Sequence, residues 1–260
     1  MKKTWCATLV CLLCAFCPCA FTQAVTSGEA PAAQTPAAAP TQPQVQKKPA
    51  AADSPAVQAL KAKAEAGDVS AQNKLGDMYG IGNGVPRNLA VSAKYFRKAA
   101  EAGDSTAQVK IGLMYFAGFG VQKDLKTSLS WYNKAAAQGN KEAMLQLARI
   151  YETGQEVTKD LQESFKWYEQ AAQHGDTEAQ IRVAVMYRNG EGVERDYKQA
   201  MKWFKKAAEK EQYEAEFSVG EMYEQGLGVP VDTEEAVRWY VKAKEHGSVT
   251  AQVRIHNLGR

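Results

Sequence analysis

The sequence predicts an all-α protein, an α-solenoid built from tandem helix-turn-helix repeats. The first observation behind this prediction is a 36-residue repeat that runs without an insertion. The second is that apolar residues in each unit recur at the spacing of one helical face, and the third is that glycine and aspartate mark the ends of the helical stretches. A helical pair repeated in this way cannot bury its apolar side alone, so neighbouring pairs must stack. The units are residues 64–99, 100–135, 136–171, 172–207 and 208–243, followed by a half repeat at 244–260.

The unit at 100–135 illustrates one repeat. Gly103 follows the previous helix, where a left-handed backbone is needed, and Asp104 can cap the next helix by accepting its free N–H groups. We call this first helix of a unit helix A, and its apolar stripe is Ala107, Ile111, Met114 and Tyr115. After a loop at 118–121, Asp124 caps the second helix, which we call helix B. The buried side of helix B is expected to be Leu125, Ser128, Leu129, Trp131, Tyr132 and Ala135.

The other units carry the same residue types at the same positions. An alanine near the start of helix A recurs at Ala71, Ala107, Ala143, Ala179, Ala215 and Ala251. An aromatic pair on helix B begins at Tyr95, Trp131, Trp167, Trp203 and Trp239. Small residues set where the helix backbones touch, and aromatic residues fill the space between them. Truncation of a buried aromatic residue to alanine is therefore expected to cost about 3–5 kcal/mol.

These residues resemble the Sel-one-like repeat, a relative of the tetratricopeptide repeats. The resemblance rests on the pattern A-x-x-x-[LIV]-[GA]-x-[MI]-Y-x-x-G-x-x-V, then Asp and W-[YF]-x-x-A-A with a following Gly, and it covers residues 64–259. It implies a right-handed superhelical α-solenoid that acts as an adaptor for complexes in envelope biogenesis, signalling or contact with a host. Glu156 and Glu211 replace glycines of the pattern, so they are the places where the turn geometry could differ.

Residues 1–24 are typical of a secretory signal peptide. Lys2 and Lys3 form a basic end, an apolar stretch follows at 5–20, and Thr22-Gln23-Ala24 offers small residues at a cleavage site. The alternatives are a transmembrane anchor or a chance apolar run, although the stretch is short for spanning a bilayer. We therefore expect an exported protein, periplasmic or secreted, in a bacterium. All five cysteines lie in this leader, so cleavage would leave a chain without thiol chemistry, and a lipid anchor is disfavoured by their context.

Residues 25–52 are rich in alanine and proline, and we expect a disordered linker. In its extended limit such a linker would span roughly 85 Å, although it could equally be an inert spacer. Residues 53–260 are expected to form the solenoid. A helix from Ser54 to about Ala66 would act as an unpaired helix B, and Ser248–Leu258 would be a final helix A, which makes twelve helices. The apolar end of that last helix could promote self-association or fray, and the oligomeric state stays open.

Charge and composition favour some classes of function over others. The chain has 32 basic and 29 acidic residues, and without the two leader lysines the balance is 30 to 29, which gives no electrostatic reason to expect nucleic acid. The three histidines, His174, His246 and His256, lack a metal-binding spacing and are expected to be plain surface residues. Glycine-rich loops at 80–84 and 118–120 follow helices, as structural turns do and phosphate loops do not. We therefore predict no catalytic residue, no metal site and no cofactor.

Two surfaces remain as candidates for binding. The first is a groove formed by the A helices, with the expected partner-binding residues Val109, Leu113, Phe116, Leu145, Arg149, Ile181, Val185, Arg188, Phe217, Glu221 and Glu224. Such a strip would suit a peptide or an amphipathic helix, unless several of these residues pack between adjacent A helices. The second is a basic row on helix B, formed by Lys94, Lys98, Lys134, Lys166, Lys202, Lys206, Arg238 and Lys242. It could contact anionic lipid or cell-wall polymer, or reflect only the preference for lysine near helix C-termini.

The leading hypothesis is an exported, non-enzymatic scaffold that binds a protein or peptide partner in the groove. A peptidoglycan- or membrane-surface-binding module is the main alternative. A β-lactamase-like enzyme is a further one, because the resemblance extends to a cysteine-rich branch linked to penicillin binding and hydrolysis. That branch staples its helix pairs with disulfides, which a mature chain without cysteine could not form.

Overall fold

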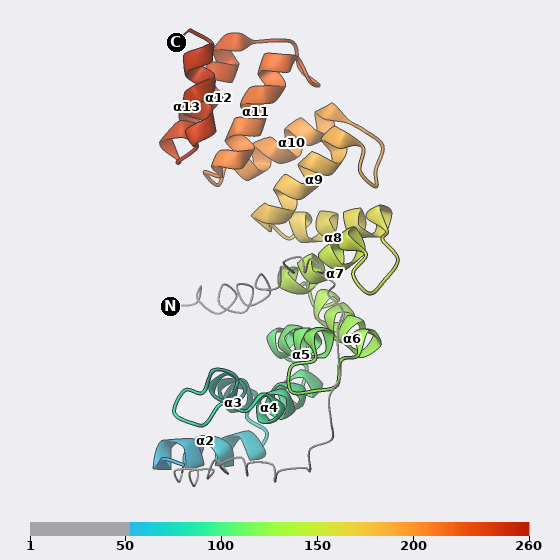
Figure 1. Ribbon diagram of the computed structural model, residues 1–260, viewed down its shortest axis with the longest axis vertical. Helices are drawn as coiled ribbons and strands as arrows, with labels where there is room; N and C mark the ends of the chain where they lie inside the picture. The colour runs from blue at the N-terminus through green and yellow to red at the C-terminus, as the bar shows by residue number, and fades with distance from the viewer. Residues whose placement is uncertain (1–52, 260) are drawn as a thin grey trace, which may run out of the picture. The chain divides into compact units, whose positions relative to one another are not determined.

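The computed structural model describes residues 53–259, so the expected signal peptide at 1–24 and linker at 25–52 lie outside the described residues. The described part is all-helical, with twelve helices and no strand. The helices are α2 (Pro55–Glu65), α3 (Val69–Ile81), α4 (Leu89–Glu101), α5 (Ser105–Ala117), α6 (Leu125–Ala136), α7 (Lys141–Thr153), α8 (Leu161–Gln173), α9 (Thr177–Asn189), α10 (Tyr197–Ala208), α11 (Tyr213–Gln225), α12 (Thr233–Glu245) and α13 (Val249–Asn257). Odd-numbered helices are the A helices and even-numbered ones the B helices, which alternate along the chain (Figure 1).

Side-chain caps fix where most helices begin. In the second unit, the Asp104 carboxylate accepts a hydrogen bond from the Ala107 N–H at 2.7 Å, and Asp124 does the same for Thr127 at 3.1 Å. Helix α11 differs, because its N-cap residue is Gln212 and no side chain bonds the free N–H groups there. The A helices from α3 to α11 end at a glycine with a left-handed backbone, such as Gly118 with φ of 74°.

The two replacements of glycine keep the same turns. Glu156 has φ of 66° and Glu211 has φ of 58°, both in the left-handed region that glycine adopts at the aligned positions. Both turns therefore have the same backbone conformation as the glycine turns, although this conformation is strained in a residue with a Cβ atom. The position of Glu211 is held in the other units by Gly67, Gly103, Gly139, Gly175 and Gly247, all with positive φ.

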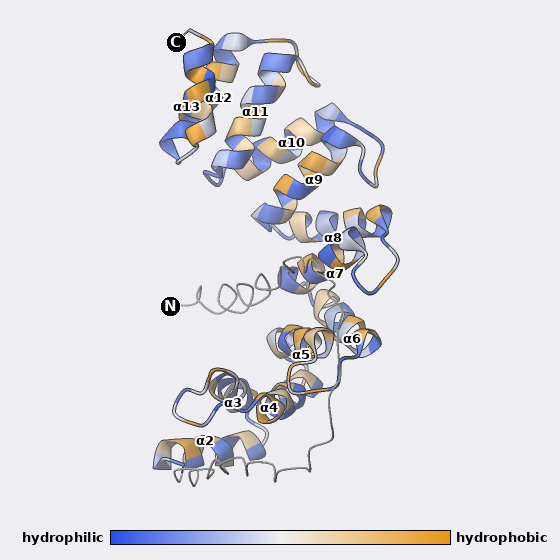
Figure 2. Cartoon of the chain, in the orientation of Figure 1, coloured by the Kyte–Doolittle hydropathy of each residue, from blue (hydrophilic) through white to orange (hydrophobic). Residues whose placement is uncertain are grey.

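The helices contact mainly their neighbours along the chain, because every substantial helix–helix contact joins consecutive elements. Each helix carries both apolar and polar residues, as Figure 2 shows. Glycine on helix A lets the aromatic residue of helix B approach: a Cβ on Gly112 would lie 2.9 Å from the Tyr132 ring. The Ser128 hydroxyl then donates to the Gly112 carbonyl at 2.7 Å. Small and large residues therefore interlock within each unit, as the sequence predicts.

A buried polar position joins each A helix to the B helix before it. Gln72, Gln108 and Gln180 are buried on helix A, and each donates its side-chain N–H to the carbonyl of the alanine eight residues earlier, at 2.9 to 3.2 Å. Helix α7 has Met144 at the aligned position and α11 has Glu216, both also buried. One position of the repeat thus holds three different side chains in the same environment.

Candidate interaction site

The expected groove residues lie on four successive A helices. Val109, Leu113 and Phe116 are on α5, and the others are on α7, α9 and α11. They occupy three positions of the repeat, each three or four residues from the next, so they share one side of each helix. We call this side the A-helix face. The three positions recur in each unit, but the residue types at two of them differ. Leu113 and Phe116 on α5 correspond to Glu221 and Glu224 on α11.

The apolar members of this set are partly buried against neighbouring helices. Val109, Leu113 and Phe116 pack against a core cluster that begins in their own unit at Tyr132 and continues into the third and fourth units. The Phe217 ring lies 5.2 Å from that of Tyr240, measured between centroids. Leu145 is 4% exposed and belongs to the core, which corrects its expected place on an accessible groove. These residues are therefore less accessible than the residues of an open groove would be.

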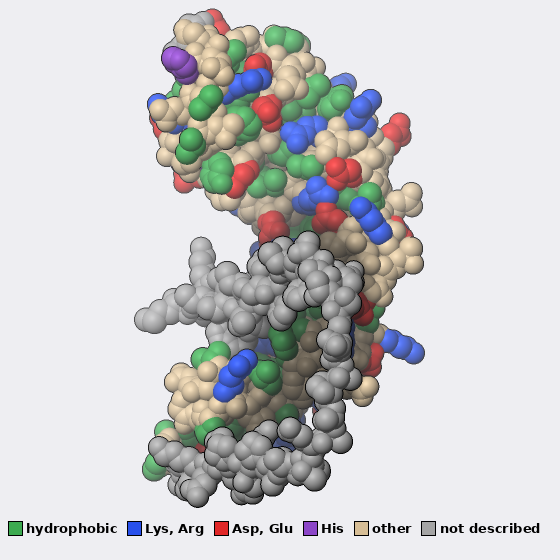
Figure 3. Space-filling model, in the orientation of Figure 1, with side chains coloured by type: hydrophobic (Ala, Val, Ile, Leu, Met, Phe, Trp, Pro, Cys, Tyr) green, Lys and Arg blue, Asp and Glu red, His purple; other side chains and the backbone are tan. Residues whose placement is uncertain are grey.

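The charged members form ion pairs that join one A helix to the next. Arg149 on α7 pairs with Glu178 on α9 at 2.5 Å, and Glu224 on α11 pairs with Arg254 on α13 at 2.9 Å. The pair between Arg188 and Glu221 is longer, at 3.7 Å. Acidic and basic side chains are interspersed on the surface that Figure 3 displays. The A-helix face therefore carries ion pairs between successive A helices, with partly buried apolar residues next to them.

A buried tyrosine contacts the glutamate of an ion pair in two places. The Tyr168 hydroxyl donates to Glu152 at 2.7 Å, and Glu152 also pairs with Arg182 of the next A helix. The same arrangement recurs in the fifth unit, where Tyr240 donates to Glu224 at 2.6 Å. Burial raises the pKa of both tyrosines, so the hydroxyls stay protonated and act as donors. These contacts between glutamate, tyrosine and arginine were not predicted from the sequence, although each of the three residues recurs 72 positions later in the chain.

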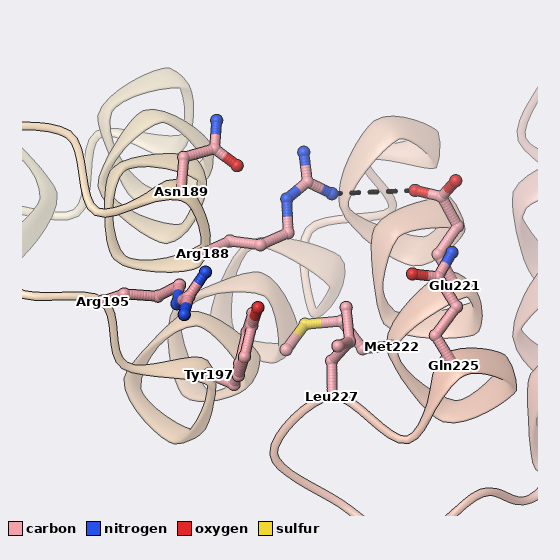
Figure 4. A pocket seen from close by; sticks show the side chains of 8 residues that line it. All are labelled: Arg188, Asn189, Arg195, Tyr197, Glu221, Met222, Gln225 and Leu227. Carbon is pink, nitrogen blue, oxygen red and sulfur yellow. Dashed lines mark ion pairs between the residues drawn. The ribbon is translucent and has the colours of Figure 1, made fainter.

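A pocket of about 620 Å³ opens between the fourth and fifth units (Figure 4). It is lined by Arg188, Asn189, Arg195, Tyr197, Glu221, Met222, Gln225 and Leu227. Arg188 extends from α9 toward Glu221 on α11, and Arg195 comes from the loop before α10. The Arg195 guanidinium carbon lies 5.5 Å from the centroid of the Tyr197 ring. The sequence singled out Arg188 and Glu221 but not Arg195, since its loop lies outside the helical pattern.

Burial affects the carboxylate on the wall of this pocket. The pKa of Glu221 is raised by desolvation, which outweighs the attraction of Arg188 and Arg254. With two guanidinium groups and one carboxylate on its wall, the pocket offers a net positive charge to a ligand.

The histidines differ from one another. The His174 ring nitrogen lies 2.9 Å from the Gln170 carbonyl on the surface. His246 is also exposed, but it contacts Glu216 at 2.8 Å, and Glu216 is only 2% exposed. This hydrogen bond raises the pKa of His246.

No cluster of three or more potential metal-ligating side chains occurs between residues 53 and 259. Within the same part of the chain, the helices are too short or too polar to span a bilayer.

The Sel1 repeat model matches the chain five times, at residues 69–104, 105–140, 141–176, 177–211 and 214–248. Comparison with curated proteins gives no significant match. Among solved structures, the chain is similar to c5321, a protective antigen of uropathogenic Escherichia coli with an SLR fold, at 39% identity and a TM-score of 0.73. That match covers 78% of this chain but only 44% of the antigen.

A Sel1 repeat protein from Oxalobacter formigenes is also similar, with 32% identity and a TM-score of 0.67. The match covers 75% of this chain and 81% of the other. The five repeats span more than half of the chain, and their period equals that of the alternating helix pairs. The chain therefore belongs to the Sel1 repeat family.

Proposed function

We propose that this protein is an exported, non-enzymatic scaffold that binds a protein or peptide partner on the A-helix face. Sel1 repeat proteins are generally protein-interaction scaffolds without catalytic activity. The observation that carries the proposal is that the core positions repeat from unit to unit while the A-helix face does not. Ala107, Ala143, Ala179 and Ala215 are all fully buried, whereas two of the three face positions change from apolar on α5 to charged on α11.

A face that only held the units together would be free to repeat, as the core does. Instead, the three positions read Val109, Leu113 and Phe116 on α5 but Phe217, Glu221 and Glu224 on α11. Variation of this kind gives each unit its own contact chemistry on a constant framework, which is how solenoids recognise extended partners. The export part of the proposal is supported only by the signal-peptide pattern at 1–24.

Site-specific crosslinking tests where the partner binds. A photoreactive residue is placed at Arg149, whose side chain is 43% exposed on the A-helix face, and in a matched variant at Lys202 on the exposed side of α10. In cells of the native host, a defined partner should crosslink from position 149 and not from position 202. Equal crosslinking from both positions, or none from 149, would contradict the proposal. Glutamate at Leu113 or Phe217 would be a poor probe, because both side chains pack against neighbouring units.

Export has its own test. The N-terminal sequence of the protein recovered from fractionated cells should begin after residue 24, in a periplasmic or secreted fraction. Recovery of a protein that still begins at Met1, in the cytoplasmic fraction, would refute export while leaving the interaction proposal open.

A second candidate function is binding to an anionic surface through helix B. The observation that favours it is α10, which carries four lysines and no acidic residue. Lys206 lies over the ring of Trp203 at 4.8 Å, and the same stack recurs for Lys134 and Lys242. Salt-sensitive sedimentation with isolated cell wall or anionic vesicles, lost when Lys198, Lys202 and Lys206 become glutamine, would support this function. Absence of sedimentation at low salt would remove it.

A further inference from the structure

The repeat provides its own control for the residues of the pocket between the fourth and fifth units. The position of Arg188 is held in the other units by Gly80, Phe116, Glu152 and Glu224. The position of Arg195 is held by Arg87, Lys123, Lys159 and Val231. Arginine occurs at both positions only in the fourth unit, so the fold itself does not require this pair.

The basic residue in the loop has an acidic neighbour in the second and third units, whereas Arg87 in the first unit donates to the Gly80 carbonyl. Lys123 pairs with Glu156 of the next unit at 2.7 Å. The pKa of Glu191 is lowered mainly by its hydrogen bond from Asn189 and by Arg182, and the charge of Lys159 adds to this effect. At the corresponding places next to Arg195, the fifth unit has Leu227 and Gly228. Arg195 forms no ion pair among residues 53–259, and its guanidinium lies over the Tyr197 ring.

The second guanidinium is only partly neutralised. Arg188 and Glu221 are 3.7 Å apart, whereas the pair between Glu224 and Arg254 is closed to 2.9 Å. Arg188 spans the pocket on its way to Glu221 in Figure 4. A ligand anion can therefore contact Arg188 without displacing a tight internal pair.

The remaining walls limit the kind of anion. Met222 and Leu227 line the pocket with apolar surface, which suits the methylene groups of a side chain. Two arginines and one glutamate leave a net charge of about +1, which matches a single carboxylate better than a doubly charged phosphate.

We propose that this pocket binds the carboxylate of an aspartate or glutamate side chain on a protein partner, with Arg195 as the main contact and Arg188 as the second. The inference rests on the proposed function, because it names the chemistry of one partner contact. It also predicts that partners carry an acidic residue where they cross the boundary between the fourth and fifth units.

NMR titration of the isotope-labelled protein tests the proposal. The probes are the capped peptide acetyl-Gly-Glu-Gly-amide, its glutamine counterpart and inorganic phosphate. The glutamate peptide should cause saturable shifts at residues 188–197 and 221–228. Its affinity should fall at least about tenfold in Arg195→Gln, while Lys159→Gln, the aligned change in the third unit, stays within about twofold of wild type. Arg188→Gln should weaken binding less than Arg195→Gln, with unchanged thermal unfolding as its control.

Three outcomes would overturn the inference: equal binding of the glutamine peptide, tighter binding of phosphate than of the glutamate peptide, or unchanged affinity in Arg195→Gln. These outcomes are separable from failure of the scaffold proposal. A partner that crosslinks at position 149 and binds Arg195→Gln as well as wild type would leave the scaffold intact and refute only the pocket.

Discussion

Replacing Gln180 with methionine should stabilise the protein, although it removes a hydrogen bond. Gln180 is fully buried, and its Oε1 has no hydrogen-bond partner, which costs about 1–3 kcal/mol. Its Nε2 donates to the Ala172 carbonyl at 3.2 Å, a bond worth about 1 kcal/mol. That carbonyl also accepts from the Gly175 N–H at 3.0 Å, so it stays satisfied without the side chain. Met144 already fills the aligned position of the third unit at 2% exposure.

The cost of the orphaned oxygen exceeds the value of the lost bond, so the free energy of unfolding should rise by about 1 kcal/mol. Methionine has nearly the volume of glutamine, so the substitution should add little packing strain. Gln108 provides the matched control. Its Oε1 accepts from Gln138 at 2.8 Å and its Nε2 donates to Ala100 at 3.1 Å, so Gln108→Met loses two bonds and relieves no orphaned atom.

We therefore expect Gln108→Met to lower the free energy of unfolding by about 1–2 kcal/mol. Urea unfolding followed by circular dichroism measures both changes. If the two variants shift stability in the same direction and by the same amount, the argument from the orphaned oxygen is refuted.

Three further predictions concern other residues. Glu211→Gly should raise stability by about 0.5–1 kcal/mol in thermal unfolding, because glycine adopts the φ of 58° without strain; a loss would contradict this. Phe204→Ala should cost about 3–5 kcal/mol in urea unfolding, since the ring is fully buried, and a cost below 1 kcal/mol would mean that the units relax around the cavity. The contribution of His246 to stability should be fully present below its ordinary pKa of about 6.5 and lost as the pH rises through its raised folded value. Glu216→Gln should flatten that pH dependence, and an unchanged profile would exclude His246 as its source.

The fold could be predicted because its determinants are local and repeat. Glycine, aspartate and alanine recur at fixed places, and each place imposes one backbone state or one close approach, as Gly112 does against Tyr132. Because the pattern occurs five times, a single departure such as Glu211 does not obscure it. The helix bounds and the interlocking of small and aromatic residues therefore follow from the pattern alone.

The site could be predicted only in part. Helical spacing placed Arg188 and Glu221 on one face, but it could not show how far Leu145 is buried, because that depends on the distance between adjacent A helices. Arg195 was not predicted for a different reason. It lies in a loop, and the lack of an acidic residue beside it in the fifth unit becomes meaningful only when the structure shows Arg195 and Leu227 lining one pocket. The contact between His246 and Glu216 likewise joins residues 30 positions apart in neighbouring units.

The uncapped start of α11 has a consequence for how the protein opens. Its first N–H groups have no side-chain acceptor, and the turn before it is strained at Glu211, so two small penalties coincide at one joint. In a one-dimensional stack, a break needs the loss of a single interface, and it occurs first where that interface is weakest. Amide hydrogens at the start of α11 should consequently exchange fastest among the inner helices. A ligand that contacts both α9 and α11 would slow this exchange, because it would hold the two units together at their weakest interface.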